Sequence, residues 1–156
     1  MKKLIFSVLF VALAFGAQAQ RKGEAQKPEG YQITDKDCVE ATSIKDQSRS
    51  GTCWSFSGLA FLESEILKNG GEVVDLSEIW IVRHCYEQKA EKFVRLHGNL
   101  NFAQGGATHD VLNTIEEFGI VPEEVYRGLN YGSEKHNHYE VDALLLGYLQ
   151  GVIKQK

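Results

Sequence analysis

The feature that most constrains the fold of this chain is an abrupt change of character at Cys53. The preceding stretch, residues 43–52, is rich in Ser, Asp, Gly and Arg and nearly free of apolar residues after Ile44, which predicts a loop. From Cys53 to Leu67, apolar residues cover most of a helical surface, which predicts a buried helix. The narrow polar strip of that helix comprises Glu63, Ser64 and Lys68. Asn69-Gly70-Gly71 predicts its end, because these residues tolerate positive φ.

Three more helices are expected downstream. Asp75-Leu76-Ser77-Glu78 has the pattern of a capping box and predicts a helix that continues to about Phe93. A Gly/Asn/Gln-rich loop over residues 98–106 precedes a helix from Thr108 to Phe118, which Gly119 closes. Residues 120–132 are extended and turn-rich, and residues 141–153 form a last apolar helical stretch. The apolar run 144–149 within it needs a surface that packs on it.

The first nineteen residues have the pattern of a secretory signal peptide. Lys2 and Lys3 form a basic start, and residues 4–15 are an almost unbroken apolar run. That run is too short to span a bilayer, for which about 20 residues are needed. Ala17-Gln18-Ala19 supplies the small-x-small pattern of a cleavage site. We therefore expect export, to a periplasm or out of the cell, and no membrane attachment of the mature chain. A mature N-terminal segment then covers residues 20–42, and a helical lobe covers residues 43–156.

Composition and charge exclude some functions. The chain is 43% hydrophobic and 24% charged, as globular proteins are, and its formal net charge is −4. Without Lys2 and Lys3, 15 basic residues face 21 acidic ones, so the mature charge is −6. No basic run or basic–aromatic interleaving points to nucleic acid. Nothing calls for a metal or cofactor.

Cys53 is also the residue with the most chemical potential. It occupies the first turn of the predicted helix, where unpaired backbone N–H groups and the helix dipole stabilise a thiolate. Gly51 allows a close approach to the helix start, and Trp54 can exclude solvent. Its own backbone N–H and the side-chain amide of Gln47, six residues upstream, are candidate donors to an oxyanion. A buried, inert helix cysteine is the alternative.

The spacing Gln47-x5-Cys53-Trp54-Ser55-Phe56-Ser57 resembles the active-site signature of papain-like cysteine peptidases. Asp75-Leu76-Ser77-Glu78 resembles the start of that family's second helix. Gln104-Gly105-Gly106, with the helix that follows, resembles the glycine pair of its substrate cleft. The resemblance covers roughly residues 44–131.

This resemblance implies the helical N-terminal lobe of an α+β papain-like fold. Cys53 would attack a peptide carbonyl to form an acyl-enzyme, and Gln47 with the Cys53 N–H would hold the oxyanion. Gly105 and Gly106 would offer backbone groups to an extended peptide or protein substrate, and Trp54 would flank it. Neither a metal nor a cofactor takes part.

Two departures bear on the subfamily. The papain and cathepsin pattern has a disulfide-bonded cysteine three residues before the nucleophile, and this chain has Ser50 there. The Ser-Gly-x-Cys-Trp form and the long second-helix region resemble the bleomycin hydrolase and aminopeptidase C branch. Three cysteines leave at least one thiol unpaired, and Cys38 with Cys85 is the pairing that leaves Cys53 free.

The family's catalytic base is missing. Its His and Asn lie about 130–150 residues after the cysteine, which falls beyond Lys156. None of the five histidines matches that position: His84 and His97 belong to the second-helix region, and His109 opens the third helix. His136 and His138 are expected in a solvated loop. We therefore expect a β-rich C-terminal domain or a second chain to complete the enzyme. A non-catalytic papain-like binding or assembly module is the alternative.

Overall fold

The computed structural model describes residues 30–31, 38–130 and 132–155. Its contacts divide the chain into two units, Met1–Asp37 and Cys38–Lys156, and the described helices all belong to the second. The predicted signal peptide lies outside the described residues. Among the residues that are described, no helix combines the length and apolar character needed to cross a bilayer.

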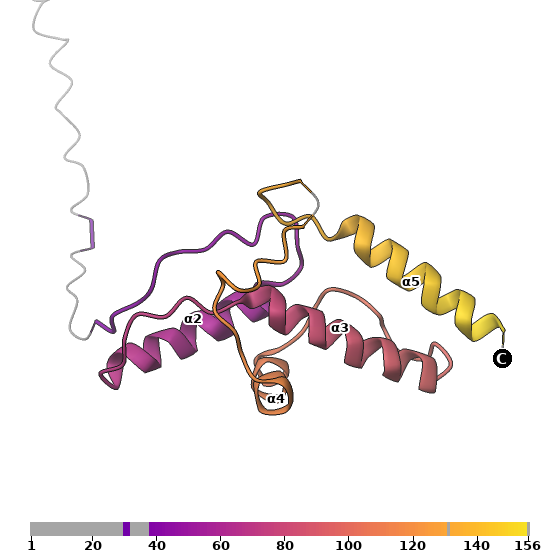
Figure 1. The fold of residues 1–156 in the computed structure, drawn as a ribbon, viewed down its shortest axis with the longest axis horizontal. Helices are drawn as coiled ribbons and strands as arrows, with labels where there is room; N and C mark the ends of the chain where they lie inside the picture. Colours follow the sequence, from indigo (N-terminus) through magenta and orange to yellow (C-terminus); the bar gives the residue numbers. More distant parts are fainter. Residues whose placement is uncertain (1–29, 32–37, 131, 156) are drawn as a thin grey trace, which may run out of the picture. The chain divides into compact units, whose positions relative to one another are not determined.

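The described part of the second unit is helical. Its helices are α2 (Cys53–Lys68), α3 (Glu78–Arg95), α4 (Thr108–Phe118) and α5 (Tyr139–Lys154), shown in Figure 1. All four were predicted, and their bounds differ from the prediction by at most two or three residues. Within the same residues, β structure is limited to two isolated bridges, which join Arg49 to Asn137 and Leu76 to Pro122.

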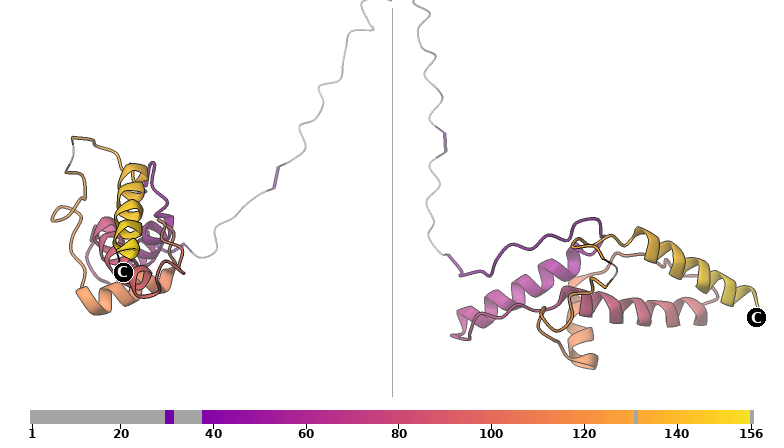
Figure 2. Two further views of the ribbon diagram at one scale, coloured as in Figure 1. Left: turned by 90° about the vertical axis from the view of Figure 1, so that its right-hand side faces the viewer. Right: turned by 45° about the horizontal axis from the view of Figure 1, so that its top comes forward.

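Helix α2 packs against both α3 and α4, and α3 also packs against α5. Figure 2 shows α4 running across the other helices, whereas Figure 1 shows it end-on. Helices α2 and α4 cross closely at Gly58, which has no side chain to keep them apart. A Cβ at this position would lie only 2.8 Å from Cγ2 of Val111. The main core consists of buried residues from α2, α3 and α4: Trp54, Leu59, Ile79, Ile81, Val82, Cys85 and Val111.

A second, smaller cluster attaches α5 to the rest. Leu149 of α5 is buried against Phe93 of α3 and Phe102 of the loop before α4. The apolar run 144–149 is therefore only partly covered within the described residues: Leu144 and Tyr148 are 71% and 70% exposed.

Helix α3 begins as predicted but with a different cap. Ser77 is the N-cap, and its Oγ accepts a hydrogen bond from the Trp80 N–H at 3.1 Å. Asp75 does not take part in a capping box, because its carboxylate instead lies 2.6 Å from the ammonium of Lys45.

The polar strip predicted for α2 is wrong at Glu63, which is fully buried. Lys45 lies 3.0 Å from its carboxylate, Thr42 donates to it, and the Leu76 N–H donates at 2.8 Å. The same ammonium lies 2.8 Å from the buried Glu78. Burial opposes the charged form of Lys45, but the carboxylates outweigh it and raise the pKa of the ammonium. This cluster joins the start of α3 to the loop before α2, so Glu63 is inside because its charge is compensated there. The prediction that the apolar surface of α2 is buried is also wrong at Phe61, whose side chain is 59% exposed.

Candidate active site

Cys53 is the first residue of α2 and is exposed. Thr52 precedes it as the N-cap, and its carbonyl accepts the N–H groups of Ser55 and Phe56 at 2.9 and 3.3 Å. The first N–H groups of a helix have no partner within the helix. A thiol at this position is therefore reachable from solvent and lies beside donors that favour an anion.

The loop before Cys53 is closed by two reciprocal hydrogen bonds. The Gln47 side-chain amide donates to the Ser50 carbonyl at 2.7 Å, and the Ser50 hydroxyl donates to the Gln47 carbonyl at 2.8 Å. A side-chain amide has two N–H donors, so this arrangement uses one and leaves the second for another acceptor. Ser50 thus stabilises a local turn at the position where the cathepsin pattern has a cross-linked cysteine.

Of the predicted glycine pair, Gly106 lies directly against Trp54 at the start of α2. A Cβ at Gly106 would lie 2.5 Å from the Trp54 ring, whereas a Cβ at Gly105 would meet nothing within 4 Å. The Trp54 indole N–H donates to the carbonyl of Gln104 at 3.0 Å. The fold therefore packs Gln104 and Gly106 against Trp54, the residue that follows Cys53.

Two residues of this region had no role assigned from the sequence. Gln104 accepts the Gly51 N–H on its side-chain oxygen at 2.6 Å. The Lys89 ammonium donates to the carbonyls of Ala103, at 3.2 Å, and Gly105, and it lies 5.7 Å from the centre of the Trp54 ring. Gln104 could have been noticed as the neighbour of the glycine pair. Lys89 has no local signal, because its contacts come from the packing of α3.

The three cysteines differ in their surroundings. All are free thiols; Cys38 and Cys53 are exposed and Cys85 is buried. The Cys85 sulfur lies 3.3 Å from the Thr114 hydroxyl, and burial raises the pKa of the Cys85 thiol. Cys85 is thus a core residue with little thiolate at neutral pH.

Within the described residues, no hydrogen bond or ion pair joins a histidine to Cys53. His84 stacks on Phe118 with ring centres 4.2 Å apart and bonds to Glu87 at 2.9 Å. His109 is 74% exposed and faces Asp110. His97 lies just beyond the end of α3 with a φ of 50°.

The expectation of a solvated loop is wrong for His136 and His138. Each is only 8% exposed, and the Nδ1 atom of each is buried without a hydrogen-bond partner. Backbone pairing with Arg49 accounts for the burial of these two histidines. The Arg49 N–H donates to the His136 carbonyl at 3.0 Å, and the His138 N–H donates to the Arg49 carbonyl at 3.1 Å. Burial lowers the pKa of both imidazoles; the charge of Arg127 adds to this at His136, and His136 itself adds to it at His138.

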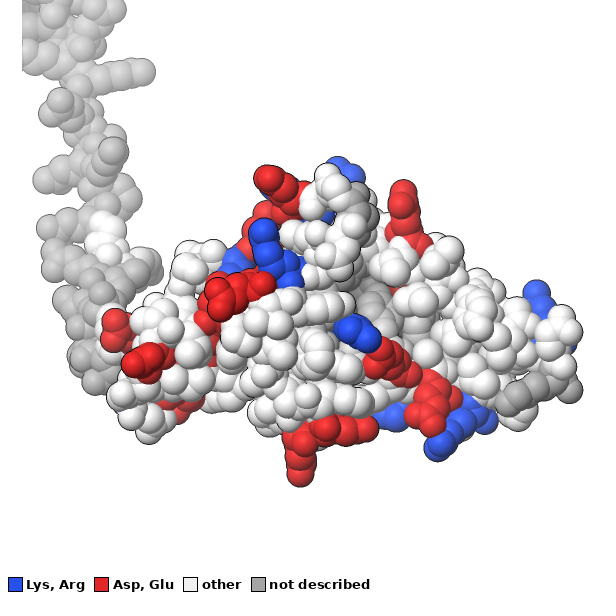
Figure 3. All heavy atoms as spheres, viewed as in Figure 1, with Lys and Arg blue, Asp and Glu red and all other residues white. Residues whose placement is uncertain are grey.

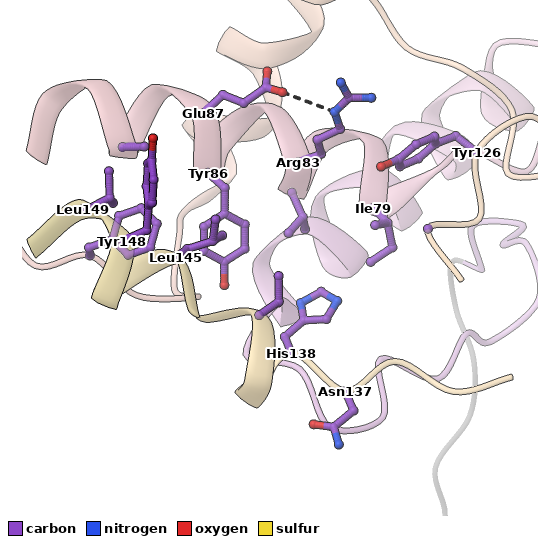
Figure 4. Close-up of a pocket in the computed structure, with 15 residues that line it drawn as sticks. Ile79, Arg83, Tyr86, Glu87, Tyr126, Asn137, His138, Leu145, Tyr148 and Leu149 are labelled. Carbon is purple, nitrogen blue, oxygen red and sulfur yellow. Dashed lines mark hydrogen bonds and ion pairs between the residues drawn. The ribbon is translucent and has the colours of Figure 1, made fainter. Parts of the chain in front are cut away.

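A hollow of about 350 Å³ adjoins the loop before Cys53. It is lined by residues 48–51, residues 103–105, Tyr139 and Asp142. A separate, mainly apolar cavity of about 510 Å³ lies between α3 and α5, and no predicted site residue lines it. Figure 4 shows Tyr86 extending from α3 towards Leu145, with the Arg83–Glu87 ion pair nearby. The Tyr86 hydroxyl donates to Asp142 at 3.2 Å, so α5 is held close to both hollows.

Charged side chains of both signs are interspersed on the face shown in Figure 3. Much of the surface over α5 in that view is uncharged, in keeping with the exposure of Leu144 and Tyr148.

Comparison with known proteins defines the family. Residues 27–147 match the model of the papain family of cysteine proteases, a range that includes Gln47, Cys53 and the glycine pair. The chain therefore belongs to the papain family, and its helices are those expected of the helical lobe of the papain-like fold, which confirms the fold prediction.

Individual proteins with similar sequences agree with this family assignment. Peptidase 1 of Psoroptes ovis is 33% identical over 111 residues, which cover 71% of this chain and 30% of that protein. Viral cathepsin of Mamestra configurata nucleopolyhedrovirus is 37% identical over 102 residues, covering 65% and 26%. Procathepsin L of Rattus norvegicus is 33% identical over 63 residues, covering 40% and 18%. The chain thus spans less than a third of the length of each.

Proposed function

We propose that this chain supplies the nucleophile half of a cysteine peptidase, with Cys53 as the nucleophile that forms an acyl-enzyme with a peptide. The observation that carries the proposal is the exposed thiol at the first position of α2, with Gly106 packed on the neighbouring Trp54. Membership of the papain family supports the same chemistry.

In this proposal Gln47 and the Cys53 backbone N–H bind the oxyanion that develops during attack. Gly105 and Gly106 pair with the backbone of an extended substrate, and the bare surface at Gly105 leaves room for that strand. Trp54 shields one side of the thiol.

The catalytic histidine and its orienting residue come, in this proposal, from polypeptide beyond these 156 residues, either a β-rich domain or a second chain. Two observations support it: no described histidine is bonded to Cys53, and relatives are more than three times as long as the region that they share with this chain. The isolated chain would then be weakly active or inactive. DNA sequence downstream of codon 156 tests this directly, because an in-frame continuation with His and Asn is expected.

We further propose export of the mature protein, on the strength of the signal-peptide pattern in residues 1–19. The Ser-Gly-x-Cys-Trp form and the long α3 favour the bleomycin hydrolase and aminopeptidase C branch, hence removal of residues from a free amino terminus.

The test is peptide hydrolysis by the protein expressed from its natural gene. Replacing Cys53→Ser should lower kcat by about a thousandfold or more, because the hydroxyl is a much weaker nucleophile than the thiolate. Cys38→Ser is the matched control and should leave the rate unchanged. Hydrolysis that survives Cys53→Ser overturns the proposal. Equal cleavage of free and N-acetylated peptides overturns the aminopeptidase assignment alone.

A further inference from the structure

The loop that leads into Cys53 and the loop that carries the glycine pair meet without a covalent link. Residues 48–51 and 103–105 line one hollow, yet neither segment holds a cysteine, and the cysteines of the described part are all free thiols. The peptidase chemistry proposed above needs both loops fixed in relation to each other, because one leads into the thiol at the start of α2 and the other carries the substrate-binding backbone.

Gln104 is placed to make that connection in two ways at once. Its side-chain oxygen accepts the Gly51 N–H at 2.6 Å, two residues before the thiol. Its backbone carbonyl accepts the Trp54 indole N–H at 3.0 Å, one residue after the thiol. Gly51 and Gln104 also pack closely, since a Cβ at Gly51 would lie 3.0 Å from Cβ of Gln104.

Lys89 holds the same loop from α3. Its ammonium donates to the carbonyls of Ala103 and Gly105, which flank Gln104, and lies over the Trp54 ring. The backbone of residues 103–105 is thus fixed on one side by α3 and on the other by the start of α2.

We propose that Gln104 is a positioning residue that connects the loop before Cys53 to the loop that carries Gly105 and Gly106 by hydrogen bonds. It rests on the proposed function for its purpose, but the connection itself exists whether or not the chain cleaves peptides. In this role Gln104 acts through Gly51 and Trp54.

Two substitutions of Gln104 by residues of similar size distinguish the loss of its hydrogen-bond acceptor from a change in side-chain volume. Gln104→Met removes the acceptor and keeps the length of the side chain. Gln104→Glu keeps an oxygen that accepts the Gly51 N–H. Gln88→Met is the control for removing a side-chain amide. Gln88 of α3 donates to Glu117 of α4 in an exposed hydrogen bond that involves neither of the two loops.

The measurement is amide and indole hydrogen exchange by NMR on the 156-residue chain. In Gln104→Met we expect the Gly51 N–H to exchange about tenfold faster, since one hydrogen bond is lost locally. The Trp54 indole resonance should also shift, whereas the Trp80 indole, bonded to the Gly119 carbonyl at 3.2 Å, serves as an internal reference and should not. Gln104→Glu and Gln88→Met should exchange as the parent does.

Unchanged Gly51 exchange in Gln104→Met, or equal acceleration in the Met and Glu variants, overturns the inference. These readouts involve no peptide hydrolysis. The exchange measurements therefore test the Gln104 connection separately from the proposed peptidase activity. Either one can fail while the other holds.

Discussion

Gly106 packs flat against the indole of Trp54, with no space between them for even a methyl group. This contact sets the distance between the glycine-pair loop and the start of α2. The neighbouring Gly105 faces open space. The two glycines therefore predict opposite responses to the same substitution.

Gly106→Ala should destabilise the chain by about 1–3 kcal/mol, because the added Cβ must displace Trp54 or the loop. Gly105→Ala should change the free energy of unfolding by less than about 0.5 kcal/mol. Urea unfolding of both variants, followed by tryptophan fluorescence, makes the comparison. Equal stability of the two variants would show that the Gly106–Trp54 contact is looser than described.

Lys45 compensates three carboxylates, and removing it should be costly. Lys45→Met leaves Glu63 and Glu78 buried without a counter-charge, which should lower the free energy of unfolding by about 3–5 kcal/mol. Lys68→Met is the matched control, because the Lys68–Glu65 pair is largely exposed and is worth less than about 0.5 kcal/mol. Chemical denaturation at neutral pH measures both. Similar losses in the two variants would contradict a buried cluster.

Glu123 predicts a dependence of stability on pH. Burial, with the negative charges of Glu78 and Asp75, raises the pKa of its carboxyl from 4.5 to about 7. Between these pH values the folded chain holds a proton that the unfolded chain releases, so this contribution to stability is present at low pH and is lost as pH rises to 7.

Glu123→Gln stays neutral at every pH. Its melting temperature relative to the parent should therefore rise between about pH 5 and pH 8, with Glu124→Gln, an exposed neighbour, as the control for loss of a carboxylate. Thermal melts at the two pH values decide the matter. A relative melting temperature of the Glu123→Gln variant that falls or stays constant over that interval would refute the raised pKa.

Local sequence signals predicted the helices, because apolar periodicity and glycine stops act within one helix. Thus the start of α2 at Cys53 and the end of α4 before Gly119 agree with the prediction. The contact of Gly106 with Trp54 could not be predicted from periodicity, because it joins residues 52 positions apart in the sequence.

Other features depend on contacts between distant residues, and the sequence pattern could not supply them. Glu63 looked like a surface residue because its partner Lys45 lies 18 positions away. His136 and His138 sit in a polar stretch, yet their pairing with Arg49 draws them inside. Gln104 lies 53 positions from Gly51, and only the folded chain reveals their hydrogen bond. The roles of Cys53 and Gln47 in catalysis stay predictions.

The central claim is that Cys53 is the nucleophile, and selective alkylation tests it most directly. Cys38 and Cys53 are both exposed, so access alone does not separate them, whereas Cys85 is buried. Iodoacetamide at about pH 7, with peptide mapping by mass spectrometry over time, should modify Cys53 about tenfold faster than Cys38, because the helix start stabilises the reacting thiolate. Cys85 should react last. Equal rates at Cys53 and Cys38 would contradict the account.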